Sequence, residues 1–181
     1  MLCLDEFGPL NLHPRHGRGW RGVGKPARIR ATYTRPHGVR HMIAALDLAT
    51  GKLFYRLRDR ERWREVLDLL KTLRTRWPGQ RRYVVVDNFS PRRHPNLTAW
   101  CADHDVELVF WPAYASWLHW IEGDFAALRH VVLGGSDFTS HPEQAAAIGA
   151  YLRWRNRHAR PKRDFAPTAK IRHPDYTIKV A

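Results

Sequence analysis

The chain reads Tyr-Val-Val-Val-Asp-Asn over residues 83–88. Three consecutive β-branched residues favour a strand, and a run that is apolar at every position is typical of a strand with both faces covered. Such strands occur in sheets that carry helices on both sides. The run ends in an acid, Asp87. Because side chains at the ends of such strands line the usual ligand crevice, Asp87 is a candidate functional residue.

A second apolar run leads into an acid in the same way. Leu2-Cys3-Leu4 is followed by Asp5-Glu6 and then by Phe7-Gly8-Pro9, which predicts a short buried strand that ends in acids and a turn. If the two strands are neighbours, Asp5 and Asp87 face each other. Two close carboxylates repel, and a divalent cation such as Mg²⁺ or Mn²⁺, which prefers carboxylate oxygens, relieves that repulsion.

The remaining patterns predict strands first and a strand–helix alternation afterwards. Further strands are expected at 29–34, 40–48, 53–57 and 106–111, and helices at 63–77, 96–104, 118–132 and 140–157. Asn96 is expected to cap its helix, and Ser140 and Glu143 have the capping-box spacing. This order predicts an α/β fold, in which an antiparallel meander is followed by parallel strands and helices cover both faces of the mixed sheet.

Glu122 supplies a third acid. It lies four residues after Leu118 and three before Phe125, so it projects from the edge of the apolar face of its helix. Each acid also has an ordinary structural interpretation: a turn cap for Asp5, an Asx turn for Asp87, and a peripheral salt bridge for Glu122. The combination of two strand ends and one helix edge is more specific than any single acid.

The charge of the chain points to a polyanionic partner. Lys and Arg total 31 against 17 Asp and Glu, a formal net charge of +14, which attracts phosphate backbones. We interpret the basic segment after the first strand as a DNA contact, with a solvated loop as the alternative: Arg15, Arg18, Arg21, Lys25, Arg28 and Arg30. A second basic group near the C-terminus invites the same interpretation: Arg153, Arg155, Arg157, Arg160, Lys162 and Arg163.

Cysteine use and hydropathy favour a soluble, cytoplasmic protein. Cys3 and Cys101 each lie in an apolar stretch, which is typical of buried free thiols in a reducing compartment. The first residues lack the pattern of a secretory signal, and no run reaches the 18 apolar residues typical of a membrane span.

Three segments, taken together, carry a family resemblance: Leu4-Asp5-Glu6, Val86-Asp87-Asn88 and Phe110-Trp111-Pro112-Ala113-Tyr114-Ala115-Ser116-Trp117-Leu118-His119-Trp120-Ile121-Glu122. They resemble the catalytic motifs of DDE transposases of the mariner superfamily, in particular its bacterial insertion-sequence branch. The 34 residues between Asp87 and Glu122 fit that pattern, and Trp154-Arg155-Asn156 also resembles the branch. The resemblance runs from Leu2 to about Phe165 and implies an RNase H-like fold, in agreement with the predicted element order.

The resemblance implies metal-dependent cleavage and strand transfer at insertion-sequence ends. In that chemistry Asp5 would bridge two Mg²⁺ or Mn²⁺ ions, and Asp87 and Glu122 would each bind one. Asn88 is a supporting candidate. Asp124 is a backup acid, but two positions round the helix from Glu122 it is expected to point elsewhere. The expected partners are transposon-end and target DNA, on which the protein would form a homodimer.

Two positions depart from the family pattern. The family usually has Asn at the position of His119, and it often has His at the position of Arg92, for which the nearby His94 is a candidate substitute. Neither position is a metal ligand in the family, so the three acids stand as candidate catalytic residues.

We expect residues 1–165 to form the catalytic domain and residues 166–181 a basic tail. The family usually carries an N-terminal helix-turn-helix domain, which is expected to be absent here and supplied by a separate protein from an upstream reading frame. Two alternatives remain open: a hydrolytic RNase H-type endonuclease that does not join strands, and a catalytically impaired transposase remnant that only binds DNA.

Overall fold

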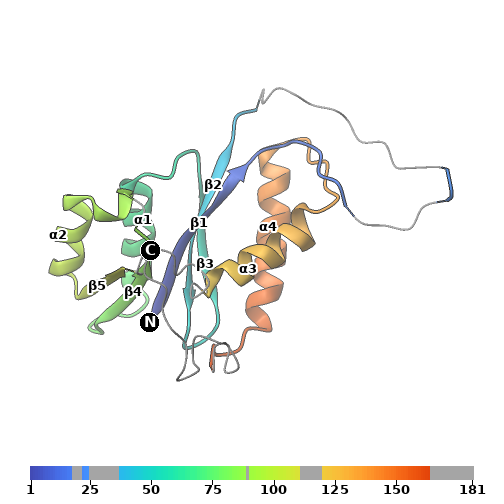
Figure 1. Cartoon of the computed structure of the whole chain (residues 1–181). Coiled ribbons are helices and arrows are strands. Elements are labelled where there is room, and N and C mark those ends of the chain that lie inside the picture. The colour runs from blue at the N-terminus through green and yellow to red at the C-terminus, as the bar shows by residue number, and fades with distance from the viewer. Residues whose placement is uncertain (18–21, 25–36, 89, 111–119, 164–181) are drawn as a thin grey trace, which may run out of the picture.

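A computed structural model describes residues 1–17, 22–24, 37–88, 90–110 and 120–163. Its five strands form one sheet in the order β3-β2-β1-β4-β5, and helices pack on both faces (Figure 1). The strands are β1 Leu2–Leu10, β2 Arg40–Asp47, β3 Leu53–Arg58, β4 Arg82–Val86 and β5 Val106–Phe110. The helices are α1 Trp63–Arg74, η1 Ser90–Arg93, α2 Pro95–Asp103, α3 Ile121–Leu128, η3 Arg129–Leu133 and α4 His141–Arg157. The predicted mixed α/β sheet is thereby confirmed.

The sheet has an antiparallel half and a parallel half. Strands β1, β2 and β3 form the meander, whereas β4 and β5 are parallel to β1. The parallel pairing of β1 with β4 is short, with Leu2 opposite Val84 and Cys3 opposite Val85. Two residues further along this register, Asp5 comes level with Asp87.

The prediction that the first strand ends at its acids was wrong, because β1 continues to Leu10. The antiparallel partner β2 pairs with β1 along its whole length, and a register shift between Phe7 and Leu10 accommodates Gly8-Pro9. Phe7 and Leu10 are buried on the sheet. Asp5 therefore lies in the middle of β1, but just beyond the last residue that pairs with β4.

Alternate side chains of β1 enter two separate cores. Leu2 and Leu4 pack with α1 and α2 on one face, and Cys3 and Phe7 pack with α3 and α4 on the other. By the same alternation Asp5 belongs to the α3/α4 face of the sheet and Glu6 to the α1/α2 face. The two neighbouring acids thus start on opposite faces.

Of the two predicted helix N-caps, the one for α2 was wrong and the one for α4 is partly confirmed. The N-cap of α2 is His94 rather than Asn96, because Pro95 occupies the first helical position and the His94 ring nitrogen Nδ1 accepts from the Asn96 N–H at 3.3 Å. Ser140 caps α4 as predicted, accepting from the Glu143 N–H at 3.3 Å. The Glu143 carboxylate reaches back to the Thr139 N–H at 2.8 Å.

The other predictions fare as follows. The helix expected at 118–132 is described from Ile121 onward and ends as the π-helix η3. The strand expected at 29–34, residue Trp111 and the tail at 166–181 lie outside the described residues. Cys3 and Cys101 are buried free thiols, as predicted. Within the described part of the chain, no helix is both long and apolar enough to cross a bilayer.

Candidate active site

The structure brings Asp5 and Asp87 together on one guanidinium group. Asp87 follows β4 directly, and the 3-10 helix η1 then turns Arg92 back over the end of that strand. The Arg92 Nη2 donates to Asp5 Oδ1 at 2.8 Å, and Nη1 forms an ion pair with Asp87 Oδ1. Asp5 Oδ1 also accepts from the backbone N–H of Glu6 at 2.9 Å. The predicted juxtaposition of the two acids is therefore observed.

Glu6 is a third acid at this place, and the sequence patterns did not assign it to the site. Its Oε2 pairs with the same Arg92 Nη2 that contacts Asp5. Only 9% of the Glu6 side chain is exposed, and its other oxygen, Oε1, is buried without a hydrogen-bond partner. The sequence indicates Glu6 only as the second of two consecutive acids after an apolar run. Because neighbouring side chains of a strand point to opposite faces, Asp5 and Glu6 are expected to diverge. Arg92 joins them at the sheet edge.

Arg92 is buried, which is rare for arginine. Burial lowers the pKa of its guanidinium, and the neighbouring Asp5 carboxylate opposes that change. Among the described residues, three carboxylates surround one guanidinium, which leaves an excess of negative charge in a partly buried place. Carboxylate oxygens are the preferred ligands of a hard divalent cation, and a second positive charge would offset this excess.

The helix that carries Glu122 packs on the same face of the sheet as Asp5. Ile121 and Phe125 of α3 are buried in that core, and the Phe125 ring lies 5.1 Å from the ring of Phe7. Burial raises the pKa of the Cys3 thiol to about 11, against which a hydrogen bond from the Trp120 backbone acts. The Phe7–Phe125 contact thus joins α3 to β1 two residues after Asp5.

The side chain of Glu122 nevertheless does not complete the site. It is exposed, and no ion pair or hydrogen bond joins it to Asp5 or Asp87. Across the described ranges, no group of three or more His, Cys, Asp or Glu side chains is arranged to hold a metal ion. The structure therefore assembles two of the three predicted acids and places the third on the adjoining helix.

The supporting residues have mixed positions. Asn88 is exposed, and its Oδ1 accepts from Arg93 Nη2 at 2.5 Å. His94 caps α2 and stacks on the Trp63 ring with centroids 4.2 Å apart. The expected substitution by His94 is thus not what the structure shows, since Arg92 itself contacts the acids. His119 lies outside the described residues.

Asp124 faces away from the candidate site, as predicted. Its carboxylate pairs with Arg155 Nη2 at 2.7 Å and accepts from Arg155 Nε at 2.8 Å, and Lys162 lies 3.7 Å from its other oxygen. Arg155 and Lys162 had been assigned to a basic DNA-contacting group. They instead hold Asp124 in a mostly buried cluster, whereas other members of that group are exposed: Arg153, Arg157, Arg160 and Arg163.

Of the basic segment assigned to DNA, only Arg15 lies within the described residues. Its backbone N–H donates to the Ser136 carbonyl at 2.9 Å, which places Arg15 beside the end of η3. Burial and the nearby charge of Arg129 lower the pKa of Arg15. The others lie outside the described part of the chain: Arg18, Arg21, Lys25, Arg28 and Arg30.

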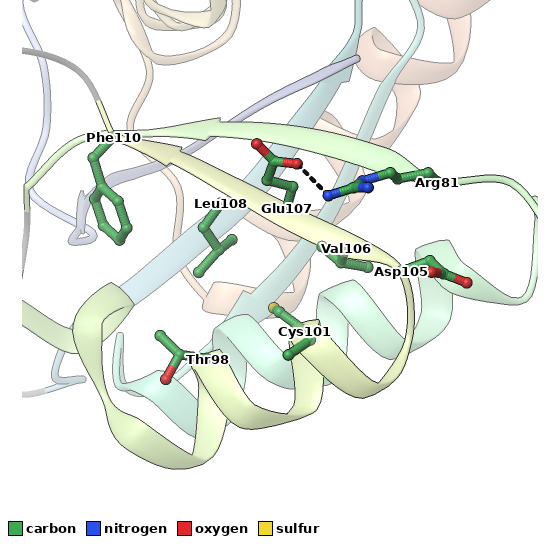
Figure 2. Close-up of a pocket in the computed structure, with 9 residues that line it drawn as sticks. Arg81, Thr98, Cys101, Asp105, Val106, Glu107, Leu108 and Phe110 are labelled. Atoms are coloured by element: carbon green, nitrogen blue, oxygen red, sulfur yellow. Dashed lines mark hydrogen bonds and ion pairs between the residues drawn. The ribbon is translucent and has the colours of Figure 1, made fainter.

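A separate pocket lies between α2 and the edge strand β5 (Figure 2). Thr98 and Cys101 line it from the helix and Leu108 from the strand, and Arg81 pairs with Glu107 at 2.7 Å beside it. None of the three predicted acids lines this pocket. The candidate active site is therefore the carboxylate cluster at the end of β4 and not this groove.

Comparison with known proteins agrees with the fold. The model of the family described as DDE superfamily endonuclease matches residues 1–143. Similar solved structures include the mariner Mos1 paired end complex with Mg, with a TM-score of 0.64 and 18% identity, covering 87% of this chain and 51% of that chain. The Mos1 paired end complex with Mn has a TM-score of 0.63 and 17% identity, covering 87% and 51%.

The Mos1 Strand Transfer Complex gives a TM-score of 0.61 at 17% identity, with coverage of 87% and 50%. This chain thus spans about half the length of these Mos1 chains. No functionally curated protein matches the sequence significantly. The structural likeness confirms the predicted RNase H-like fold, and the family match covers most of the sequence together with all three predicted acids. The chain belongs to the DDE superfamily endonucleases.

Proposed function

We propose that this chain is a transposase catalytic domain that cleaves DNA strands at insertion-sequence ends and joins them to target DNA. One observation carries the proposal. Asp5 and Asp87 reach the same Arg92 guanidinium from neighbouring strands, so their carboxylates converge at one point of the sheet edge. The family model supports endonuclease chemistry, and the similar Mos1 structures include complexes with Mn and with Mg.

The proposal assigns two Mg²⁺ or Mn²⁺ ions to the site. Asp5 would bridge them, Asp87 would hold one, and Glu122 would hold the other. When bound, such ions supply an activated water or DNA 3′-hydroxyl and stabilise the leaving oxygen. The packing of Phe125 on Phe7, with ring centroids 5.1 Å apart, keeps α3 near the face of β1 that carries Asp5, which supports the assignment of Glu122.

The proposed partner is DNA, bound at transposon ends and at the target. The net charge of +14 supports this assignment, as do the similar Mos1 structures, which include a Strand Transfer Complex and a paired end complex. We further propose that the protein acts as a homodimer on DNA. In this scheme residues 1–165 are the catalytic domain, 166–181 a basic tail, and a separate helix-turn-helix protein selects the ends.

The decisive experiment is cleavage of DNA that carries the terminal repeats of the parent element, with Mg²⁺ or Mn²⁺ and with EDTA. Wild type is expected to nick this DNA only with metal, and Asp87→Asn is expected to lose the activity. Asp103→Asn is the matched control, because Asp103 is an exposed acid at the end of α2. Equal cleavage by wild type and Asp87→Asn would refute the proposed site.

Two outcomes of a second assay separate the alternatives. With pre-cut ends and a target plasmid, a transposase joins strands, whereas a hydrolytic RNase H-type endonuclease cleaves without joining. The second alternative, a remnant that only binds DNA, is favoured by one observation: Arg92 already pairs with Asp5 and Asp87, two of the acids that would hold metal. Metal-independent binding of the end DNA without any cleavage would select it.

A further inference from the structure

The feature that the proposed function leaves unexplained is the buried guanidinium of Arg92. The structure pairs it with Asp5, Glu6 and Asp87 at once. Its side chain is 1% exposed, whereas the side chains of its partners are 16%, 9% and 51% exposed in that order. Arginine carries only donors and stays positively charged, so Arg92 cannot itself ligate a metal ion.

We propose that Arg92 is an internal cation that competes with divalent metal for the carboxylates of Asp5 and Asp87. The inference rests on the proposed function, because it takes these two acids as the metal ligands. Metal loading then requires the guanidinium to withdraw from both. The site is consequently held in a metal-poor form until the divalent ion is concentrated enough to displace Arg92.

Competition follows from charge and from shared atoms. The guanidinium contacts Oδ1 of Asp5 and Oδ1 of Asp87, the two side chains that would hold the metal. Two positive groups at one partly buried place repel strongly, because the effective dielectric constant there is well below that of water. A carboxylate that is paired with Arg92 also attracts a metal ion less strongly, because the guanidinium already neutralises its charge.

Glu6 offers Arg92 an alternative ion-pair partner. It lies on the α1/α2 face, away from the face shared by Asp5 and α3, and its Oε1 is buried without a hydrogen-bond partner. By moving toward that oxygen, Arg92 exchanges its bonds to Asp5 and Asp87 for a two-point pair with Glu6. Such bidentate pairing is favourable for guanidinium and carboxylate. The withdrawal therefore need not leave an unpaired buried charge.

The test is a Mn²⁺ titration of the metal-stripped whole chain, with free Mn²⁺ followed by electron paramagnetic resonance. Arg92→Gln removes the competing charge and is expected to bind Mn²⁺ about tenfold more tightly than wild type, within the usual range for coupled sites. Arg155→Gln is the matched control, because it also removes a mostly buried arginine from a carboxylate. It should bind Mn²⁺ as wild type does.

A second variant covers the case in which Arg92→Gln does not fold. Arg92→Lys keeps the charge but lacks the planar fork, so it cannot hold both Asp5 and Asp87 at once. It is expected to bind Mn²⁺ more tightly than wild type, by less than the Gln variant. Unchanged or weaker Mn²⁺ binding in the folded variants would overturn the inference, and weaker binding would mean that Arg92 only organises the acids.

The outcomes also separate this inference from the proposed function. Adding Asp87→Asn to Arg92→Gln should abolish the gained Mn²⁺ affinity, and a gain that survives would overturn the inference. Metal-dependent cleavage by wild type without tighter Mn²⁺ binding in the Arg92 variants would leave the function standing and refute the competition. Tighter Mn²⁺ binding by the Arg92 variants, with no DNA cleavage by wild type or by any variant, would support the competition and refute the proposed function.

Discussion

Two mostly buried arginines hold carboxylates in this molecule, and the net charges of the two clusters, with the arginines included, have opposite signs. Arg92 faces three carboxylates, Asp5, Glu6 and Asp87. Arg155 faces one, Asp124, which Lys162 also approaches at 3.7 Å. Both arginines are sheltered, with side chains 1% and 11% exposed. A cluster with more carboxylates than basic groups attracts a further cation. A cluster without that excess of negative charge does not, and its ion pairs only stabilise the fold.

The connections made by the second cluster agree with that structural task. Arg155 of α4 joins Asp124 of α3 and also donates to the Gly51 carbonyl at 2.7 Å, in the turn before β3. Its neighbour Asn156 makes two bonds to the backbone of Leu53, at 2.8 and 2.9 Å. The Arg155 cluster therefore fastens two helices to the meander. Arg92 instead joins the ends of elements around a point where negative charge collects.

The largest expected contrast is in catalysis. Asp5→Asn removes a proposed metal ligand and is expected to lower the rate of DNA cleavage by about a thousandfold, as loss of a charge-stabilising group in an active site typically does. Asp124→Asn should leave the rate within about twofold, because Asp124 serves only the Arg155 cluster. Initial cleavage rates below the melting temperature of both variants measure this. A similar loss in both would erase the distinction between the clusters.

The next contrast is in stability, and it runs the other way. Asp124→Ala leaves the positive charges of Arg155 and Lys162 without their carboxylate and should cost about 3 kcal/mol, as breaking a buried pair usually does. Asp87→Ala should cost about 1 kcal/mol or less, because Arg92 keeps Asp5 and Glu6 and the mutual repulsion of the acids falls. Urea denaturation in EDTA gives both values. A larger loss for Asp87→Ala would show that its site is mainly structural.

A smaller effect links metal to stability. A ligand that binds only the folded chain stabilises it by about 1.4 kcal/mol at ten times its dissociation constant, which is a melting-temperature gain of about 3–6 °C for a chain of this size. Mn²⁺ should give this gain to wild type and to Arg155→Gln but not to Asp87→Asn. Differential scanning fluorimetry measures it. An equal gain in Asp87→Asn would locate the metal elsewhere.

Sequence patterns predicted the features that depend on neighbouring residues and missed those that depend on remote contacts. Continuous apolar runs, such as Val84-Val85-Val86, and local caps, such as Ser140, act through neighbouring residues, so the strands, most helices and the mixed sheet were predicted. The full length of β1 was missed because Gly8-Pro9 is a turn signal locally, whereas the pairing with β2 that overrides it is remote in sequence. Local chemistry also favoured Asn96 as a cap until the structure placed Pro95 inside the helix.

The candidate site divides in the same way. Asp5 and Asp87 were predictable because each directly follows an apolar run, and the parallel register then aligns them. Glu6 and Arg92 were not assigned to the site. Arginine is seldom buried, and nothing local indicates that residues 86 positions apart share a contact. The structure leaves Glu122 exposed on the adjoining helix, so its role in the site stays a prediction.

A third arginine–carboxylate contact supplies the smallest effect, and here the arginine, Arg62, is 48% exposed although Glu65 is only 13% exposed. At the start of α1, the Arg62 N–H and Nη2 donate to the Glu65 carboxylate at 3.1 and 2.8 Å. The hydrogen bond from the Arg62 side chain holds the pKa of Glu65 below its usual 4.5. Its stabilising contribution is therefore fully present above pH 4.5 and is lost as the pH falls through the lower folded value.

Glu65→Gln should accordingly lower the melting temperature by at most about 2 °C at pH 7, since exposed ion pairs contribute little. The difference from wild type should shrink as the pH falls below 4.5. Melting curves of both proteins between pH 3 and pH 7 test this, with Arg155→Gln as the sheltered counterpart that stays destabilised over much of that range. A Glu65→Gln penalty as large as that of Arg155→Gln would mean that shelter from solvent does not set the strength of these contacts. The opposite net charges of the Arg92 and Arg155 clusters would then be the only property left to explain why only the first is proposed to bind metal.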